Sequence, residues 1–110
     1  MIRIITACGD QGDGCTEGLQ YVAAPEEKHE VRCCADKSQN EFSKKGGCNV
    51  WGGSNLFGED GGARDCHDVK TYKEATAICA ANNARLCTKQ EVLARCTSDT
   101  GCGFDRQLVW

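Results

Sequence analysis

The stretch TYKEATAICAANNARLCTKQEVLARC, residues 71–96, decides the fold because it contains two helix starts of the same kind. Thr71 is followed three residues later by Glu74, and Thr88 is followed at the same spacing by Glu91. This spacing is that of a capping box, in which the two side chains satisfy free amides at the beginning of a helix. The stretch therefore predicts two short helices in succession.

The first of these helices has an apolar face and a defined stop. Ala75, Ile78 and Cys79 recur at the spacing that places helical side chains against a core. Asn82 or Asn83 can end the helix, because asparagine tolerates the left-handed conformation found at many helix ends. The first helix is therefore expected between Thr71 and this asparagine pair.

The second helix, of about nine residues, is too short to be stable in water by itself. Its capping box adds only about 1 kcal/mol. Cys87 stands just before it and Cys96 stands at its end. We expect both cysteines to fasten the helix to the rest of the domain through disulfide bonds.

Cysteine is abundant in the whole chain, with 10 among 110 residues, a density typical of small disulfide-bonded domains. Because cytosolic thiols are kept reduced, this count predicts a secreted protein or the extracellular part of a surface protein. Connectivity cannot be deduced from the sequence, and two local bridges, Cys8 with Cys15 and Cys96 with Cys102, are a hypothesis. The even number fits five bridges, made by Cys8, Cys15, Cys33, Cys34, Cys48, Cys66, Cys79, Cys87, Cys96 and Cys102.

Short strands are expected at residues 2–6, 29–34 and 103–110, where apolar and β-branched residues cluster or alternate, and residues 19–23 form a further short apolar piece. Cys33 and Cys34 should have different partners if they lie on a strand, because neighbouring strand side chains point to opposite faces.

Residues 35–68 contain seven glycines and show no apolar period, which favours a long ordered loop. Cys48 and Cys66 can tie this loop to the body, and Trp51, Leu56 and Phe57 can pack against it. The sequence thus predicts an α+β fold, with two short helices on a small, mainly antiparallel sheet. Residues 1–110 should form a single disulfide-rich module, excised from a larger multi-module protein.

Charge and hydropathy exclude several classes of partner. The net charge is −3 and the sequence pI is about 5.3, whereas nucleic-acid binding calls for a basic face. Anionic membrane surfaces are disfavoured for the same reason. No apolar stretch reaches the length of a membrane-spanning helix, so direct membrane insertion is not expected.

The region from about 68 to 110 resembles the core of the C-type-lectin-like superfamily, including its Link-like and formylglycine-enzyme-like relatives. In that core, a helix with an EA…C signature leads into a T-x-x-E helix and a strand that bears tryptophan. The resemblance implies a C-type-lectin-like fold in which Cys79 bonds a partner distant in sequence. The stretches VRCCAD, RLCT and TGCG also resemble cysteine-rich modules of secreted or surface proteins of marine algae. The matching positions are Glu74, Ala75, Cys79, Arg85, Leu86, Thr88, Glu91 and Trp110.

Calcium-dependent sugar binding in such lectins uses a Glu-Pro-Asn or Gln-Pro-Asp tripeptide, and the chain has neither, since its one proline is Pro25. A different ligand surface is suggested by NVWGGSNLFG, where Trp51, Asn55 and Phe57 lie among glycines. The flat rings can form an exposed platform for a sugar or a protein partner, or they can fill the small core under the loop.

A glycine-rich acidic loop is a second candidate site, because calcium binds several carboxylate oxygens. Its residues are Glu59, Asp60, Asp65 and Asp68, and the alternative is that these carboxylates are simply solvated. Calcium is therefore a possible cofactor. Zinc is disfavoured because adjacent cysteines and the lone His29 and His67 do not give the usual ligand spacing.

These patterns predict a non-catalytic extracellular recognition or adhesion module that binds a glycan or a protein partner. The alternative is a structural spacer or repeat module of a matrix or cell-surface protein. An enzyme is not expected, because no nucleophile stands beside a base.

Overall fold

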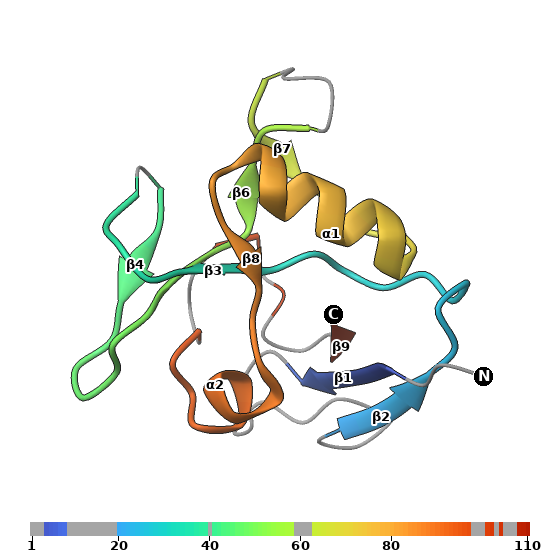
Figure 1. Cartoon of the computed structure of the whole chain (residues 1–110), viewed down its shortest axis with the longest axis horizontal. Helices are drawn as coiled ribbons and strands as arrows, with labels where there is room; N and C mark the ends of the chain where they lie inside the picture. Colours follow the sequence, from blue (N-terminus) through green and yellow to red (C-terminus); the bar gives the residue numbers. More distant parts are fainter. Residues whose placement is uncertain are drawn as a thin grey trace.

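The structure is a computed structural model that describes residues 4–8, 20–39, 41–58, 63–97, 101–102, 104 and 108–110. These residues form a small α+β domain with two helices and short antiparallel strands (Figure 1). No helix in these ranges is long and apolar enough to cross a membrane.

Helix α1 (Tyr72–Ala81) is the longer of the two and has the predicted ends. The Thr71 hydroxyl accepts a hydrogen bond from the Glu74 amide at 3.3 Å, and the Glu74 carboxylate accepts one from the Thr71 amide at 2.9 Å. At the other end, Asn82 is the C-cap and Asn83 has a φ of 55°. The capping box and the asparagine stop are confirmed.

Helix α2 (Lys89–Leu93) has the predicted capping box at Thr88 but covers five residues, fewer than expected. It ends early because Arg95 adopts a left-handed φ of 63°, which ordinary helical backbone does not allow. Its two anchors are confirmed, since Cys87 is bonded to Cys34 and Cys96 to Cys48.

Within the described residues, the strands form three small sheets, where the sequence predicted a small, mainly antiparallel sheet. The three-stranded sheet has the order β2 (Gln20–Ala23), β1 (Ile4–Cys8), β9 (Leu108–Val109). The four-stranded sheet has the order β4 (Ser43–Lys44), β5 (Trp51–Gly53), β3 (Cys33–Ala35), β8 (Arg85–Leu86). The third sheet pairs β6 (Asn55–Leu56) with β7 (Asp65–Cys66). Every one of these ladders is antiparallel.

Two predictions about strands need correction. The segment 35–68, expected to be a loop, contributes β4, β5, β6 and β7, whose two or three residues are too few for alternation to be visible in the sequence. The strand expected at 29–34 is regular only from Cys33, and before it His29 and Glu30 form single bridges to Lys70 and Val109.

Four disulfides connect the described elements. Cys33 bonds Cys79 on α1, while its neighbour Cys34 bonds Cys87, so the predicted split between opposite faces of β3 is confirmed. The distant partner expected for Cys79 is also confirmed, at a separation of 46 residues.

The predicted pairing of Cys96 with Cys102 is wrong. Cys96 lies in a buried cluster with Val50 and Cys34 and bonds Cys48, which leaves Cys102 to bond Cys66. Cys15 lies outside the described residues, so the expected Cys8–Cys15 bridge stays a prediction.

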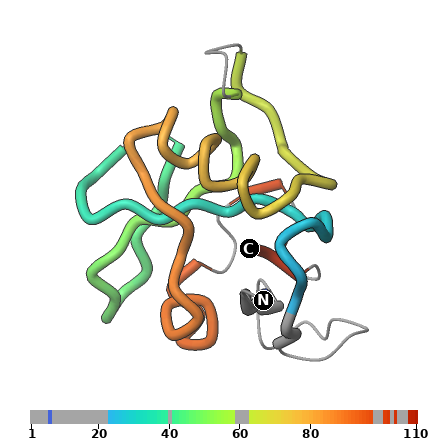
Figure 2. The backbone as a smooth tube through the Cα atoms, turned by 45° about the vertical axis from the view of Figure 1, so that its right-hand side comes forward, coloured from blue at the N-terminus to red at the C-terminus, as the bar shows by residue number. Residues whose placement is uncertain are grey.

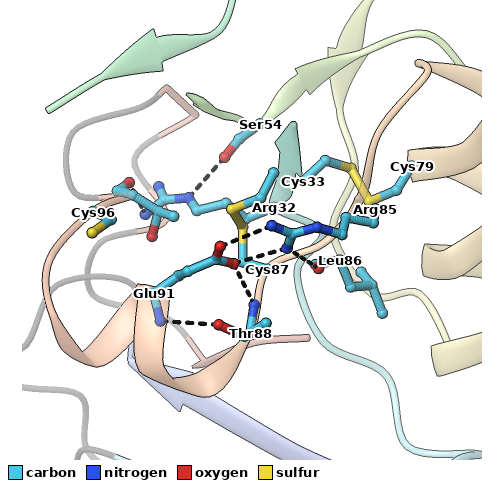
Figure 3. The surroundings of a disulfide bond; sticks show 12 residues. Arg32, Cys33, Ser54, Cys79, Arg85, Leu86, Cys87, Thr88, Glu91 and Cys96 are labelled. Carbon is cyan, nitrogen blue, oxygen red and sulfur yellow. Dashed lines mark hydrogen bonds and ion pairs between the residues drawn. A yellow bond between two sulfur atoms is a disulfide. The ribbon is translucent and has the colours of Figure 1, made fainter. Parts of the chain in front are cut away.

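The main core lies between α1 and the strands that cross beneath it. It contains Val31, Leu56, Ile78 and Trp110, all nearly or fully buried. Arg32 is also fully buried, and its guanidinium donates to the Ser54 hydroxyl at 2.9 Å (Figure 3). It also donates to the Thr97 carbonyl at 2.8 Å. The chain after α2 is therefore held against β3 by polar as well as apolar contacts.

Candidate functional site

Phe57 is an exposed aromatic side chain with a fixed backbone. It follows Leu56 of β6, and whereas Leu56 is fully buried, Phe57 is 39% exposed. The amide oxygen of Asn82 accepts a hydrogen bond from the Phe57 amide at 2.9 Å, and the Asn82 amide nitrogen donates to the Phe57 carbonyl at 2.9 Å. These two bonds attach Phe57 to the end of α1. The β6–β7 pair lies beside this helix end (Figures 1 and 2).

Both polar atoms of the Asn82 side chain are hydrogen-bonded in this arrangement. Its amide nitrogen also donates to the Ile78 carbonyl at 2.8 Å, which satisfies one of the free carbonyls at the helix end. The sequence predicted Asn82 only as a possible helix stop, so its second task, holding Phe57, was missed.

Arg64 lies over the Phe57 ring. Its guanidinium carbon is 4.2 Å from the ring centroid, which is close for a cation–π contact. Its Nη1 donates to the backbone carbonyl of Asn55 at 3.0 Å. Asn55, predicted as a ligand residue, therefore contributes its backbone to the positioning of Arg64.

A groove of about 220 Å³ lies beside this pair. Across it, the Gln39 side chain donates to the Asn83 carbonyl at 2.9 Å. The Phe42 ring packs on Gly53, where an added Cβ would come within 2.7 Å of the ring. Together with Phe57, these contacts give the groove fixed walls. Its lining residues are Gln39, Phe42, Phe57, Arg64, Ala81, Asn82 and Asn83.

The groove is smaller than typical sites for drug-sized ligands, which occupy about 300–1,000 Å³. Its size suits one group of a larger ligand. Its lining side chains offer aromatic surface, amides and one positive charge. The arrangement is suited to non-covalent recognition.

Trp51, the other aromatic of the predicted platform, lies elsewhere. It is on β5, half-buried, with the Lys44 ammonium 5.3 Å from its ring centroid. It is not among the residues that line the groove. The structure thus gives Trp51 and Phe57 different surroundings.

The predicted calcium ligands are only partly described. Asp65 and Asp68 are exposed, and a carboxylate oxygen of Asp65 accepts a hydrogen bond from the Cys66 amide at 2.8 Å. Glu59 and Asp60 lie outside the described residues. Calcium binding therefore stays a prediction.

In the described part of the chain, three metal-type donors come together at Cys34, Cys87 and Glu91. The two sulfurs are bonded to each other, and the Glu91 carboxylate is held by Arg85 through two contacts of 2.8 Å (Figure 3). These donors are occupied by structural bonds.

The Arg85–Glu91 pair joins two side chains by a two-point hydrogen-bonded ion pair. The hydrogen bonds from Arg85 lower the pKa of Glu91 below its ordinary value, although partial burial opposes this, and the Thr88 amide lowers it further. In return, the pKa of Arg85 is raised, first by Glu91 and also by Asp36. The pair ties β8 to the start of α2, so its role is structural.

No family model, curated protein or solved structure matches the chain. The resemblance to the C-type-lectin-like superfamily therefore stays a prediction.

Proposed function

We propose that this chain is a non-catalytic recognition module of an extracellular protein, and that it binds a glycan or a protein partner at the groove of Phe57. The observation that carries the proposal is the exposure of an aromatic ring on a backbone that is hydrogen-bonded at both its N–H and its C=O group. A rigid, exposed aromatic loses little conformational entropy when a ligand covers it.

The surrounding scaffold supports an extracellular location. Four disulfides hold the described elements together, and such bonds persist in oxidising compartments. We also propose that the fold is C-type-lectin-like. The two capping-box helices and the bond from Cys79 to β3 support this assignment. In this proposal, the groove is the binding surface, and the disulfides stabilise the elements that form it.

The test begins with the native chain on a glycan array and on an array of extracellular proteins, and continues with the affinity of Phe57→Ala for the ligand that is found. Removing a central aromatic contact should weaken binding by roughly tenfold or more. The melting temperature should change little, because the ring is already partly in water. Val69→Ala is the matched control, since Val69 is another exposed apolar residue, 59% exposed and outside the groove.

Equal affinities of Phe57→Ala and the native chain would refute the proposed site. A native chain that binds nothing on either array would favour the structural spacer. Trp51→Ala belongs in the same assay, because a loss of affinity without a fall in melting temperature would extend the binding surface to β5.

A further inference from the structure

We infer that the groove receives the carboxylate of an aspartate or glutamate side chain from a protein partner, and that Arg64 binds it. This inference rests on the proposed function and names the chemistry of the ligand. Its basis is the charge, the unused hydrogen-bonding capacity and the size of the groove.

The charge of the groove is positive and local. Of the described residues that line it, Arg64 is the one that carries a charge. Within the described residues, no carboxylate lies within ion-pair distance of the Arg64 guanidinium, since the ion pairs of the structure involve His29 and Arg85. Because the whole chain carries a net charge of −3, the attraction for an acidic group is confined to short range around Arg64.

The guanidinium of Arg64 is held in position before a ligand arrives. Its central carbon lies 4.2 Å from the Phe57 ring centroid, and one of its N–H groups donates to the Asn55 carbonyl. A guanidinium has five N–H donors, so several are left for a ligand. Arginine pairs with carboxylates through two parallel hydrogen bonds, and prior positioning reduces the entropy lost when they form.

The remaining surface favours a protein side chain over a sugar. A sugar presents several hydroxyl groups, which need several free polar partners. Here the Asn82 amide makes three bonds within the protein, and the Gln39 amide nitrogen donates to the Asn83 carbonyl. What is left among the described lining residues is the aromatic surface of Phe42 and Phe57 and the Asn83 side chain, next to a single cation.

This combination matches a short aliphatic chain that ends in a carboxylate. A volume of about 220 Å³ admits one such side chain. Arginine and aromatic residues are also the types enriched at the centres of protein–protein interfaces. We therefore assign the groove to an acidic side chain flanked by apolar residues on the partner.

The experiment uses the full ¹⁵N-labelled chain and two probe peptides, acetyl-Leu-Glu-Leu-amide and acetyl-Leu-Gln-Leu-amide. Amide chemical shifts report binding at the groove through Phe57 and Asn83. The glutamate peptide should bind roughly tenfold more tightly than the glutamine peptide, the value expected for a charge-assisted hydrogen bond. Arg64→Gln should remove this difference, whereas Lys73→Gln, which makes the same charge change on the exposed surface of α1, should preserve it.

Glucuronate serves as the sugar probe with the same carboxylate chemistry. Tighter binding of glucuronate than of the glutamate peptide would overturn the assignment to a protein partner. Equal binding of the two peptides at the groove would overturn the role of the carboxylate but leave the proposed function intact. Failure of both peptides to shift the groove resonances would also overturn the inference. The proposed function fails on different outcomes: no ligand is found on either array, or Phe57→Ala has no effect on the ligand that is found.

Discussion

The two disulfides that start at β3 should not contribute independently to the free energy of unfolding. Removing them one at a time and together tests this. Cys33–Cys79 spans 46 residues and Cys34–Cys87 spans 53. In the chain-entropy model, either loop closed alone adds about 4 kcal/mol to the free energy of unfolding. However, the bridges start at neighbouring residues and end at Cys79 and Cys87, eight positions apart. With one bridge present, the other closes a loop of only about ten residues, worth about 3 kcal/mol.

Removing one bridge should therefore lower the free energy of unfolding by about 3 kcal/mol. The two variants are Cys33→Ala with Cys79→Ala, and Cys34→Ala with Cys87→Ala. Removing both bridges should cost about 1 kcal/mol more than the two separate losses together, because the last bridge removed closes the long loop.

The assay is a double-mutant cycle by urea denaturation, with sucrose in all four samples to keep the weakest variant folded. Packing losses at each site occur in the single and the double variants, so they largely cancel in the coupling energy. Strictly additive losses would refute the reasoning, since they would mean that the two loops are independent.

Three further changes test the folded structure. Asn82→Ala should lower the free energy of unfolding by about 3 kcal/mol, because the Phe57 N–H and C=O groups lose their partners; a loss below about 1 kcal/mol in urea would mean that water replaces the amide. Val69→Asn should raise it by about 1 kcal/mol, since the β-branched Val69 has a φ of 55° that asparagine tolerates; an unchanged midpoint would argue against backbone strain. Arg85→Ala should cost about 1 kcal/mol at neutral pH, because the pair with Glu91 is partly exposed. Since the pKa of Glu91 is lowered in the folded state, its stabilisation is present above the ordinary value of 4.5 and is lost as the pH falls through the folded-state pKa. As the pH is lowered, the melting temperature of the native chain should therefore fall more steeply than that of Arg85→Ala. Equal slopes of melting temperature against pH would contradict this.

The sequence predicted the helices well because their signals are local. A threonine and a glutamate three residues apart need only each other and the backbone between them, and both capping boxes form as expected. The opposite directions of Cys33 and Cys34 follow from strand geometry in the same way.

The sheets could not be predicted in this way, because their partners are distant. β5 is held between β3 and β4, and β8 joins β3 from more than 50 residues away in the sequence. Strands of two or three residues show no alternation, and the β3–β8 pair lies beside the Cys34–Cys87 bridge, whose connectivity the sequence leaves open. The wrong Cys96–Cys102 pairing has the same origin, since short separation in the sequence did not decide which sulfurs meet.

The candidate site was half visible in the sequence. Phe57 stood out as a large ring among glycines, although its exposure remained open. Arg64 and Asn82 were missed because they contact Phe57 from two other segments. Arg64 directly precedes β7, and Asn82 lies at the end of α1. The signal that could have helped was the arginine seven residues after Phe57 in an otherwise acidic stretch.

The two hydrogen bonds between the Asn82 side chain and the Phe57 backbone link the motion of the groove wall to that of the last turn of α1. Backbone protons at helix ends normally exchange with solvent readily, because the end opens locally without unfolding of the whole domain. Here the Asn83 and Ala84 amides donate to carbonyls of α1 at 3.1 and 2.9 Å. A ligand that immobilises Phe57 should therefore slow deuterium uptake at these two amides, and the exchange rate at the helix end is expected to report whether the groove is filled.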